Sequence, residues 1–418
     1  MKFSSFGNSF SNDAGIVQLM DDLGHALSVN KSMLMLGGGN PGQIPEVQAR
    51  FRQRMVDILD TGDQFERLIG DYDPPQGETR FREALAALLR REFGWPLSAD
   101  NIAITNGSQS ASFMLFNMLA GRDDSGAPRR ILLPLTPEYI GYADQGVVAD
   151  MFTANRPSIE HLAGHLFKYH VDFDKLTLGD DISAICVSRP TNPTGNVLTD
   201  DEVAKLMELA RRHEVPLILD NAYGTPFPHI IFSDATPVWD DNVILCMSLS
   251  KLGLPGVRTG IVIANEQIIR GLASVNAIVN LTTGGFGAAL TVDMIESGEI
   301  ISISNDIIRP FYQDKADQAV DLIRRQFAGY EFAIHKPEGA IFLWLWFSGL
   351  PISSAQLYQR LKEHGVLVIP GHYFFPGLTE EWAHKHECIR LTYSQSTDVV
   401  ERGIAIIADE VKRAYDRG

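Results

Sequence analysis

The chain has 418 residues, of which 45% are hydrophobic and 21% charged, as is typical of a globular, enzyme-sized protein with two or three structural units. Asp and Glu total 52 against 36 Lys and Arg, and the resulting charge of −16 disfavours nucleic acid because it repels a phosphate backbone. No apolar run approaches the ~20 residues of a membrane-spanning helix. We therefore expect neither nucleic acid nor a membrane as a partner.

The N-terminal residues do not look like a targeting signal. Residues 1–15 lack the apolar stretch of a secretory signal, and the acidic residues 21–22 are unlike a mitochondrial presequence. The cysteines, Cys186, Cys246 and Cys388, are few, odd in number and far apart, which does not suggest a disulfide framework. The sequence therefore predicts a cytoplasmic protein.

Short apolar, β-branched runs recur along the chain and predict buried strands. Between them, residues 200–213 carry apolar side chains at helical spacing, and Thr199 suits the N-cap of that helix. Strands that alternate with helices predict an α/β fold with a mostly parallel sheet covered on both faces. The predicted strands are 102–105, 131–134, 184–188, 216–220, 243–248 and 260–264.

The pattern changes towards the C-terminus, where a second, smaller α+β unit is predicted. Helical periodicity at 305–327 precedes alternating or apolar runs at 340–347, 365–370 and 387–393, and a helical pattern at 399–415 follows. We therefore predict a large domain of residues 46–307 and a small domain of residues 308–418 together with residues 1–45.

Chemically reactive residues follow neighbouring predicted strands, where parallel sheets bind ligands. Asp220 ends one strand, Ser248 and Lys251 form a Ser-x-Ser-Lys loop after the next, and Arg258 lies seven residues beyond the lysine. Alone, such an Asp is usually a turn cap and such a Lys a surface residue. Together they supply an amine for an aldehyde, an acid for a ring nitrogen, and a hydroxyl and cation for a phosphate, which predicts pyridoxal 5'-phosphate as cofactor.

Two further loops fit the same cofactor. The loop before Ser108 and Gln109 joins a strand to a helix, so it places backbone N–H groups and a hydroxyl at a helix N-terminus, a natural phosphate site. An ordinary N-cap is the alternative interpretation of Ser108. Residues 188–195 form a Pro-rich turn in which Asn192 is placed to bond the ring hydroxyl, although Asn-Pro-Thr-Gly alone indicates only a turn.

Together these motifs resemble the class I and II aminotransferases, which are fold-type I pyridoxal phosphate enzymes. The resemblance covers nearly the whole chain and keeps the family's order of motifs. It implies an α/β fold in which a large domain has a mostly parallel, seven-stranded sheet between helices, beside a smaller α+β domain. The matching segments are 36–41, 72–77, 106–109, 137–139, 192–195, 220–223, 248–258 and Arg390.

The resemblance also implies roles for individual residues. Lys251 binds the cofactor aldehyde as a Schiff base and later moves the α-proton of the substrate, and Asp220 and Tyr223 complete the catalytic set. Tyr223 bonds the phenolic oxygen of the cofactor. Tyr139 stacks on the ring, and Tyr142 is the other candidate for that contact.

On the substrate side, the resemblance implies amino acids and 2-oxo acids. Arg390 clamps the α-carboxylate with its planar guanidinium, and Gly39 and Asn192 assist. No second arginine is placed by motif for a side-chain carboxylate, which favours small apolar substrates. Stretches similar to the branch of the family that exchanges the amino group between valine and pyruvate are 36–41, 137–142, 246–256 and 335–346.

Tyr72, in Tyr-x-x-x-x-Gly, matches a family residue that reaches the phosphate of the partner subunit. The resemblance therefore implies a homodimer with shared active sites. A buried core tyrosine is the alternative interpretation of Tyr72.

Other functions remain as alternatives: another small or apolar amino acid as substrate, a β-lyase with the same lysine and phosphate cup, or a non-catalytic regulator. The pattern Gly37-x-Gly39-x-x-Gly42, with Asp57 or Asp60 downstream, formally matches the site of a dinucleotide-dependent dehydrogenase, but Pro41 and Pro45 stand where its helix should run. His384, His386 and Cys388 alternate in a way that also suits metal ligands, yet a polar strand end accounts for them better, and we predict no metal.

Overall fold

The computed structural model describes residues 2–4, 7–8, 24 and 32–417. Residues 1–45 were predicted to belong to the small domain, and most of them lie outside these described residues. The same holds for most of the N-terminal residues on which the predicted cytoplasmic location rests. None of the helices in the described ranges is long and apolar enough to cross a membrane.

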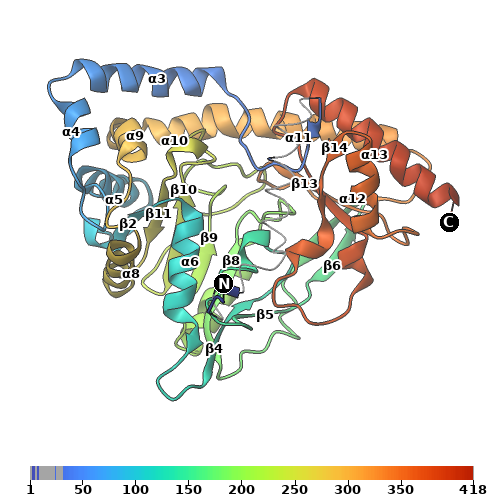
Figure 1. Ribbon diagram of the computed structural model, residues 1–418, viewed down its shortest axis with the longest axis horizontal. Helices are drawn as coiled ribbons and strands as arrows, with labels where there is room; N and C mark the ends of the chain where they lie inside the picture. The colour runs from blue at the N-terminus through green and yellow to red at the C-terminus, as the bar shows by residue number, and fades with distance from the viewer. Residues whose placement is uncertain (1, 5–6, 9–23, 25–31, 418) are drawn as a thin grey trace.

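A mixed sheet of eight strands forms the centre of the larger part of the molecule (Figure 1). Its order is β2-β11-β10-β9-β8-β4-β3, with β5 also paired to β4. The strands from β10 to β5 run parallel, whereas β11 is antiparallel to both neighbours. The bounds are β2 (Ile102–Thr105), β3 (Gly121–Arg122), β4 (Pro128–Leu133), β5 (Phe152–Ala154), β8 (Ile182–Ser188), β9 (Leu217–Asp220), β10 (Val243–Ser248) and β11 (Gly260–Ile263).

All the strands predicted for this sheet form, each within three residues of its expected bounds. The sheet has eight strands where the resemblance implied seven. The two-residue strand β3 accounts for the difference, because the turn after it folds β3 back as an antiparallel partner of β4.

Helices cover both faces of this sheet, and alternate side chains of each strand divide between them. On β10, Val243, Leu245 and Met247 belong to one apolar cluster, while Ile244 and Cys246 pack into the other. The helices are α3 (Pro45–Asp60), α4 (Gln64–Gly70), α5 (Thr79–Phe93), α6 (Ser108–Leu119), α7 (Asp200–Arg212), α8 (Glu266–Val279), α9 (Phe286–Ser297), α10 (Glu299–Ile303), α11 (Arg309–Gln326), α12 (Ser354–Glu363) and α13 (Thr397–Arg417).

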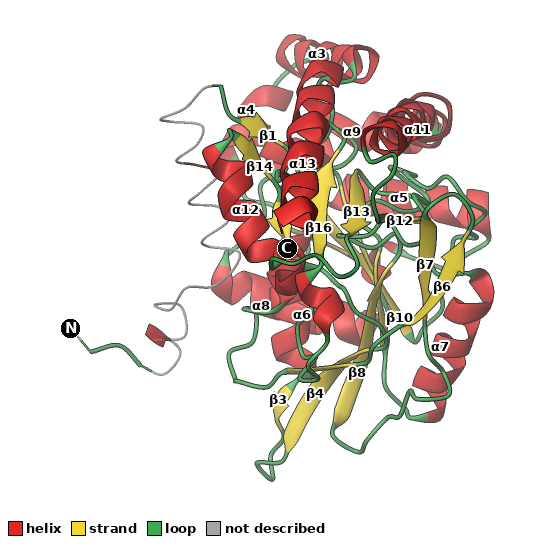
Figure 2. Cartoon of the chain, turned by 90° about the vertical axis from the view of Figure 1, so that its right-hand side faces the viewer, coloured by secondary structure: helices red, strands yellow, loops and turns green. Residues whose placement is uncertain are grey.

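A second sheet of six strands lies beside the first, in the order β15-β16-β13-β12-β7-β6 (Figure 2). Two of its strands, β6 and β7, come from the middle of the chain and extend the sheet formed by the C-terminal strands. Its strands are β6 (Ser158–Leu162), β7 (Leu166–His170), β12 (Ala333–His335), β13 (Phe342–Trp346), β15 (Ile369–Pro370) and β16 (Cys388–Thr392).

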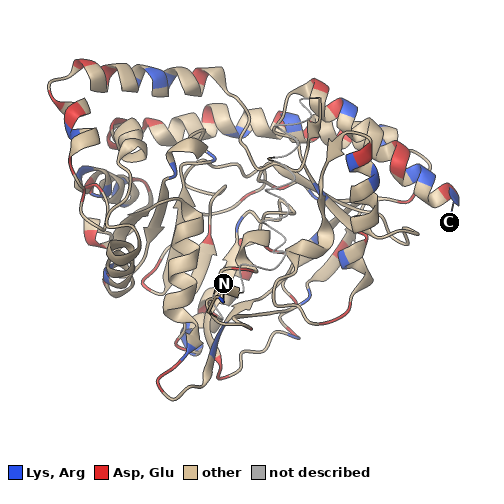
Figure 3. Cartoon of the chain, viewed as in Figure 1, with Lys and Arg blue, Asp and Glu red and all other residues tan. Residues whose placement is uncertain are grey.

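A separate pair, β1 (Leu34–Met35) with β14 (Val366–Leu367), ties the start of the described main segment to the C-terminal part. The long helices α11 and α13 pack against one another over this part. Lys, Arg, Asp and Glu are interspersed along their outer faces (Figure 3). Mixed charge of this kind is a solvated surface.

Candidate active site

The predicted site residues, which are far apart in the sequence, line one cavity at the carboxyl ends of the parallel strands. This is the position expected for a ligand site in such a sheet, since loops from neighbouring strands diverge there. The predicted residues that line the cavity are Gly39, Ser108, Gln109, Tyr139, Asn192, Asp220, Tyr223, Ser248, Lys251, Arg258 and Arg390.

Asp220, the last residue of β9, is held at the floor of this cavity. Its Oδ2 accepts a hydrogen bond of 2.6 Å from the Tyr142 hydroxyl, and its Oδ1 accepts one of 3.2 Å from the Ala222 N–H. Burial raises the pKa of the Asp220 carboxyl, although the Tyr142 hydroxyl opposes the shift. A buried carboxylate with room beside it is suited to a cationic ring nitrogen.

Tyr139 and Tyr142 occupy different positions. The Tyr139 ring lines the cavity, whereas Tyr142 is buried behind Asp220 in the apolar cluster below α6. The two rings meet edge to face, with centroids 5.4 Å apart. Of the two stacking candidates, only Tyr139 therefore presents its ring to the cavity.

At the N-terminus of α6, groups that bind anions converge. The helix begins at Ser108, and the first N–H groups of any α-helix have no intrahelical acceptor. Gly107, which precedes it, has φ 85°, and a Cβ there would lie 2.2 Å from Nη2 of Arg258. The Arg258 guanidinium is therefore packed against this helix end, where it donates to the Pro255 carbonyl and to the Ser250 hydroxyl. A cation, hydroxyls and a helix N-terminus together fit a phosphate.

Lys251 lines the same cavity as Arg258 and Arg390. Its Nζ donates a 2.5 Å hydrogen bond to the Gly39 carbonyl and lies 5.2 Å from the centre of the Tyr223 ring. Burial, with help from the charges of Arg390 and Arg258, lowers the pKa of Lys251 to about 8. A lysine with a lowered pKa is a neutral amine more of the time, so it is a better nucleophile and base.

Arg390, on β16, is buried, with only 3% of the residue exposed, and no acidic side chain among the described residues pairs with it. Its Nη1 donates a 2.7 Å hydrogen bond to the Asn192 side-chain oxygen, and its Nη2 donates a 2.7 Å hydrogen bond to the Gly37 carbonyl. Its buried Nε has no hydrogen-bond partner among the described residues. Burial lowers the pKa of Arg390 to about 10, so the group is still cationic at neutral pH. A buried cation that faces neutral acceptors is suited to bind a carboxylate.

The Arg390 guanidinium also lies 4.0 Å above the Phe342 ring of β13. This contact with the aromatic ring fixes the plane of the guanidinium group. The ammonium group of a lysine has no such plane to orient.

Tyr72 and Gln109 differ in their position relative to the cavity. Tyr72 is 81% exposed and does not line it, so the alternative of a buried core tyrosine is wrong. Gln109 does line it, and its amide donates a 3.4 Å hydrogen bond to the Gly141 carbonyl.

Sequence reasoning missed several lining residues. Ser250 stands inside the Ser-x-Ser-Lys loop, and Ser188 pairs directly with Asp220 in the sheet, so both were within reach of the strand-end rule. Ser188 is itself held by the buried Glu138, which accepts from both its N–H and its hydroxyl. Gly37, Ile140, Pro190 and Ala222 also line the cavity; each lies inside a segment singled out from the sequence, but no role was predicted for it.

The segments that resemble dinucleotide and metal motifs make structural contacts instead. Strand β1 of the Gly-rich segment pairs with β14 alone, and the helix after it starts only at Pro45, so no dinucleotide-binding unit forms from these described residues. His384 contacts the Tyr169 hydroxyl and lies 3.6 Å from the Cys388 sulfur. In the part of the chain that the structure describes, no group of three or more His, Cys, Asp or Glu side chains is arranged to hold a metal ion.

The family model for aminotransferase class I and II matches residues 35–407. The valine–pyruvate aminotransferase of Escherichia coli strain K12 is 51% identical over 415 residues, which cover 99% of each chain. A Psychrobacter arcticum 273-4 protein of known structure has a TM-score of 0.98 at 46% identity and full coverage of both chains. The crystal structure of valine–pyruvate aminotransferase from Salmonella typhimurium LT2 has a TM-score of 0.89 at 50% identity, covering 96% of this chain and 100% of that one.

These matches extend over the segments that carry the cavity, from Gly37 to Arg390. The chain belongs to the class I and II aminotransferases.

Proposed function

We propose that this enzyme transfers the amino group between L-valine and pyruvate, giving 2-oxoisovalerate and L-alanine, with pyridoxal 5'-phosphate as cofactor. Aminotransferases of this family use that cofactor. The identity of 51% to the Escherichia coli valine–pyruvate aminotransferase supports the substrate pair. One observation carries the reaction class: the buried Arg390, which donates to two neutral oxygen atoms, shares a cavity with Lys251.

The chemistry of the cavity fits the cofactor. The cavity is lined by a carboxylate, hydroxyls, a guanidinium and a helix N-terminus, which are the groups that bind a pyridinium nitrogen and a phosphate. When bound, the cofactor supplies an electron sink for the negative charge that develops at the substrate Cα. In our assignment Asp220 holds the charge on the ring nitrogen and Tyr139 stacks on the ring. The phosphate is held by Ser108, Gln109, Ser248, Ser250 and Arg258, and the phenolic oxygen by Asn192 and Tyr223.

Lys251 and Arg390 divide the work on the substrate. Nζ of Lys251 would hold the cofactor aldehyde when no substrate is bound. Once the substrate amine has displaced it, the free amine would remove the α-proton of the amino acid and, in the reverse half-reaction, return a proton to Cα. With the cofactor bound, Arg390 and the Gly39 N–H would hold the substrate carboxylate and orient Cα so that its α-proton is presented to Lys251. This orientation selects proton transfer over decarboxylation.

A spectroscopic titration tests this proposal. The purified protein, incubated with pyridoxal phosphate, should have a visible absorption band that bleaches with L-valine and returns with pyruvate. No band at all would contradict the cofactor assignment, and a band that responds to another amino acid but ignores valine would contradict the substrate. Release of ammonia from a single cysteine-type substrate would instead identify the β-lyase.

The smaller and larger parts of the chain both contribute to the cavity. We propose the division into a cofactor-binding domain of residues 46–307 and a small domain of residues 308–418 with 1–45. In this division Lys251 and Asp220 come from the first and Arg390 and Gly39 from the second. The hairpin of β6 and β7, although inside 46–307, pairs with the sheet of the small domain.

We also propose a homodimer, to which Tyr72 contributes across the interface. Tyr72 lies in a segment that runs beside the end of α8, because Asn276 donates a 2.6 Å hydrogen bond to the Pro75 carbonyl. Large apolar side chains are exposed on both segments: Ile69, Tyr72, Ile278, Val279 and Leu281. An apolar surface of this kind is suited to a second copy of the chain.

Ile278→Asp should therefore produce a monomer, since it puts a charge into the proposed interface. Sedimentation velocity measures the mass of the wild type and of the variant. Val147→Asp, at an exposed valine in the loop before β5, is the matched control and should stay dimeric. A monomeric wild type, or a dimeric Ile278→Asp, would refute this interface.

A further inference from the structure

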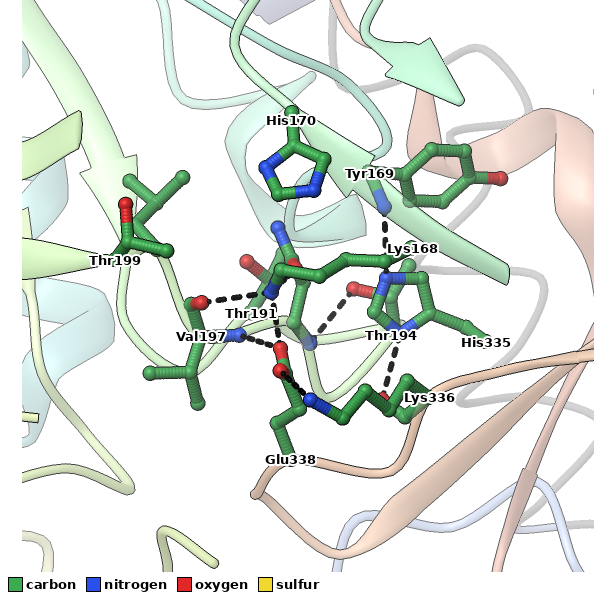
Figure 4. A network of polar contacts seen from close by, with 12 residues as sticks. Lys168, Tyr169, His170, Thr191, Thr194, Val197, Thr199, His335, Lys336 and Glu338 are labelled. Atoms are coloured by element: carbon green, nitrogen blue, oxygen red, sulfur yellow. Dashed lines mark hydrogen bonds and ion pairs between the residues drawn. The ribbon is translucent and has the colours of Figure 1, made fainter. Parts of the chain in front are cut away.

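A buried ion pair outside the cavity joins the second sheet to the turn that carries Asn192. Lys168 lies on β7, and Glu338 lies in the loop before β13. Their side chains are only 6% and 5% exposed. Figure 4 shows Lys168 and Lys336 approaching the Glu338 carboxylate from two sides.

Both members of the pair form hydrogen bonds with the end of this turn. Lys168 uses its three donors on Glu338, on the Asn196 side-chain oxygen and on the Val197 carbonyl, the last two at 2.9 Å. Oε2 of Glu338 also accepts the Val197 N–H at 3.2 Å. Both charges therefore bind residues 196–197, although they come from two different segments of the second sheet.

The position of residues 196–197 determines that of Asn192, because the turn between them is short and its two ends are hydrogen-bonded to each other. The Thr191 N–H donates to the Asn196 carbonyl at 2.9 Å, and the Gly195 N–H to the Thr191 carbonyl at 2.8 Å. Asn192, between them, accepts the hydrogen bond from Arg390. A shift of residues 196–197 would move the oxygen that orients the guanidinium.

The Glu338 loop constrains the same guanidinium from a second direction. A Cβ at Gly195 would lie 2.6 Å from the Gly339 carbonyl, and one at Gly339 would lie 3.0 Å from the Pro190 ring, so loop and turn are in close contact. Four residues beyond Glu338, the Phe342 ring lies under Arg390. Two contacts of Arg390 therefore belong to segments that the ion pair joins.

We propose that Lys168 and Glu338 are positioning residues for Arg390. They lie outside the cavity lining, and they set the affinity for the substrate carboxylate by holding the Asn192 turn against the Phe342 strand. The inference rests on the proposed role of Arg390 as the carboxylate clamp.

The test compares Lys168→Met and Glu338→Gln with the wild-type holoenzyme. Because a misplacement of about 1 Å in a positioning contact can cost about 100-fold, we expect kcat/KM for valine to fall at least about tenfold, mainly through KM. The inhibition constant of isovalerate, a carboxylate with no amino group, should rise in parallel. The dissociation constant of pyridoxal phosphate should rise less than the isovalerate constant, because Asn192 is only one of several proposed contacts with the cofactor. Lys336→Met is the matched control: Lys336 contacts the same carboxylate but is 45% exposed, and its loss should leave these constants unchanged.

A double variant separates positioning from stability alone. In Lys168→Met/Glu338→Met no unpaired charge remains buried, so the melting temperature should recover relative to Lys168→Met. If the pair positions Arg390, the isovalerate constant stays raised in the double variant. A constant that recovers with the melting temperature, or single variants with unchanged constants, would overturn the inference. Failure of the wild type to bind isovalerate or to turn over valine would instead contradict the proposed function.

Discussion

Replacing Lys251 with alanine is expected to lower the turnover of L-valine with pyruvate by at least about 10⁴-fold, the upper end of what one acid–base group contributes. The loss should be this large because one nitrogen atom serves both as the covalent anchor of the cofactor and as the base for the α-proton. Burial lowers the pKa of Lys251 to about 8, so its amine is neutral more of the time than a lysine of ordinary pKa near 10.4. Formation of alanine from pyruvate measures the rate.

Lys175→Ala is the matched control for this experiment, since Lys175 is an exposed lysine paired with Asp172. Its activity should equal that of the wild type. Circular dichroism and the melting temperature establish that Lys251→Ala is folded. Substantial activity in a folded Lys251→Ala protein would refute the central assignment.

Replacing Arg390 with lysine is expected to raise KM for valine and for 2-oxoisovalerate by about 30-fold to 150-fold, the equivalent of the 2–3 kcal/mol of a strong charge-assisted hydrogen bond. The charge is retained, but lysine cannot make two parallel contacts with a carboxylate, nor stack flat on Phe342. It also cannot reach the Asn192 oxygen and the Gly37 carbonyl with fixed geometry. Steady-state kinetics with each substrate measure the effect.

Arg402→Lys, at an exposed arginine paired with Asp398 on α13, is the control and should have unchanged kinetics. The affinity of the Arg390→Lys variant for pyridoxal phosphate, followed by absorbance, should also be unchanged, since Arg258 is the cation at the proposed phosphate site. An unchanged KM for valine would contradict the role of Arg390.

Local structure was largely predictable. The N-cap predicted at Thr199 forms, and the structure shows it as a capping box: the hydroxyl accepts from the Glu202 N–H, and the Glu202 carboxylate accepts from the Thr199 N–H. The strand before Lys251, residues 243–248, has its predicted bounds. Both patterns depend on neighbours within a few residues, which is why the sequence reveals them.

The hairpin of β6 and β7 had no comparable signal. Strand β7 pairs with β12, more than 150 residues further along the chain. Lys168 of β7 is buried in an ion pair with Glu338, which the fold places beside it. A lysine in a short strand indicates a surface position by itself. Its tertiary partner reverses that expectation.

The amino-acid sequence is enough to predict which reactive groups are present, their order, and the strand ends that display them, because strand and helix formation follow local apolar periodicity. Which of these groups meet depends on the packing of the folded chain. Asn192 and Arg390 are 198 residues apart in the chain and share a 2.7 Å hydrogen bond, and Tyr142 lies behind Asp220 while Tyr139 faces the cavity. Such contacts depend on how sheets and loops pack over long sequence separations, which no local pattern encodes.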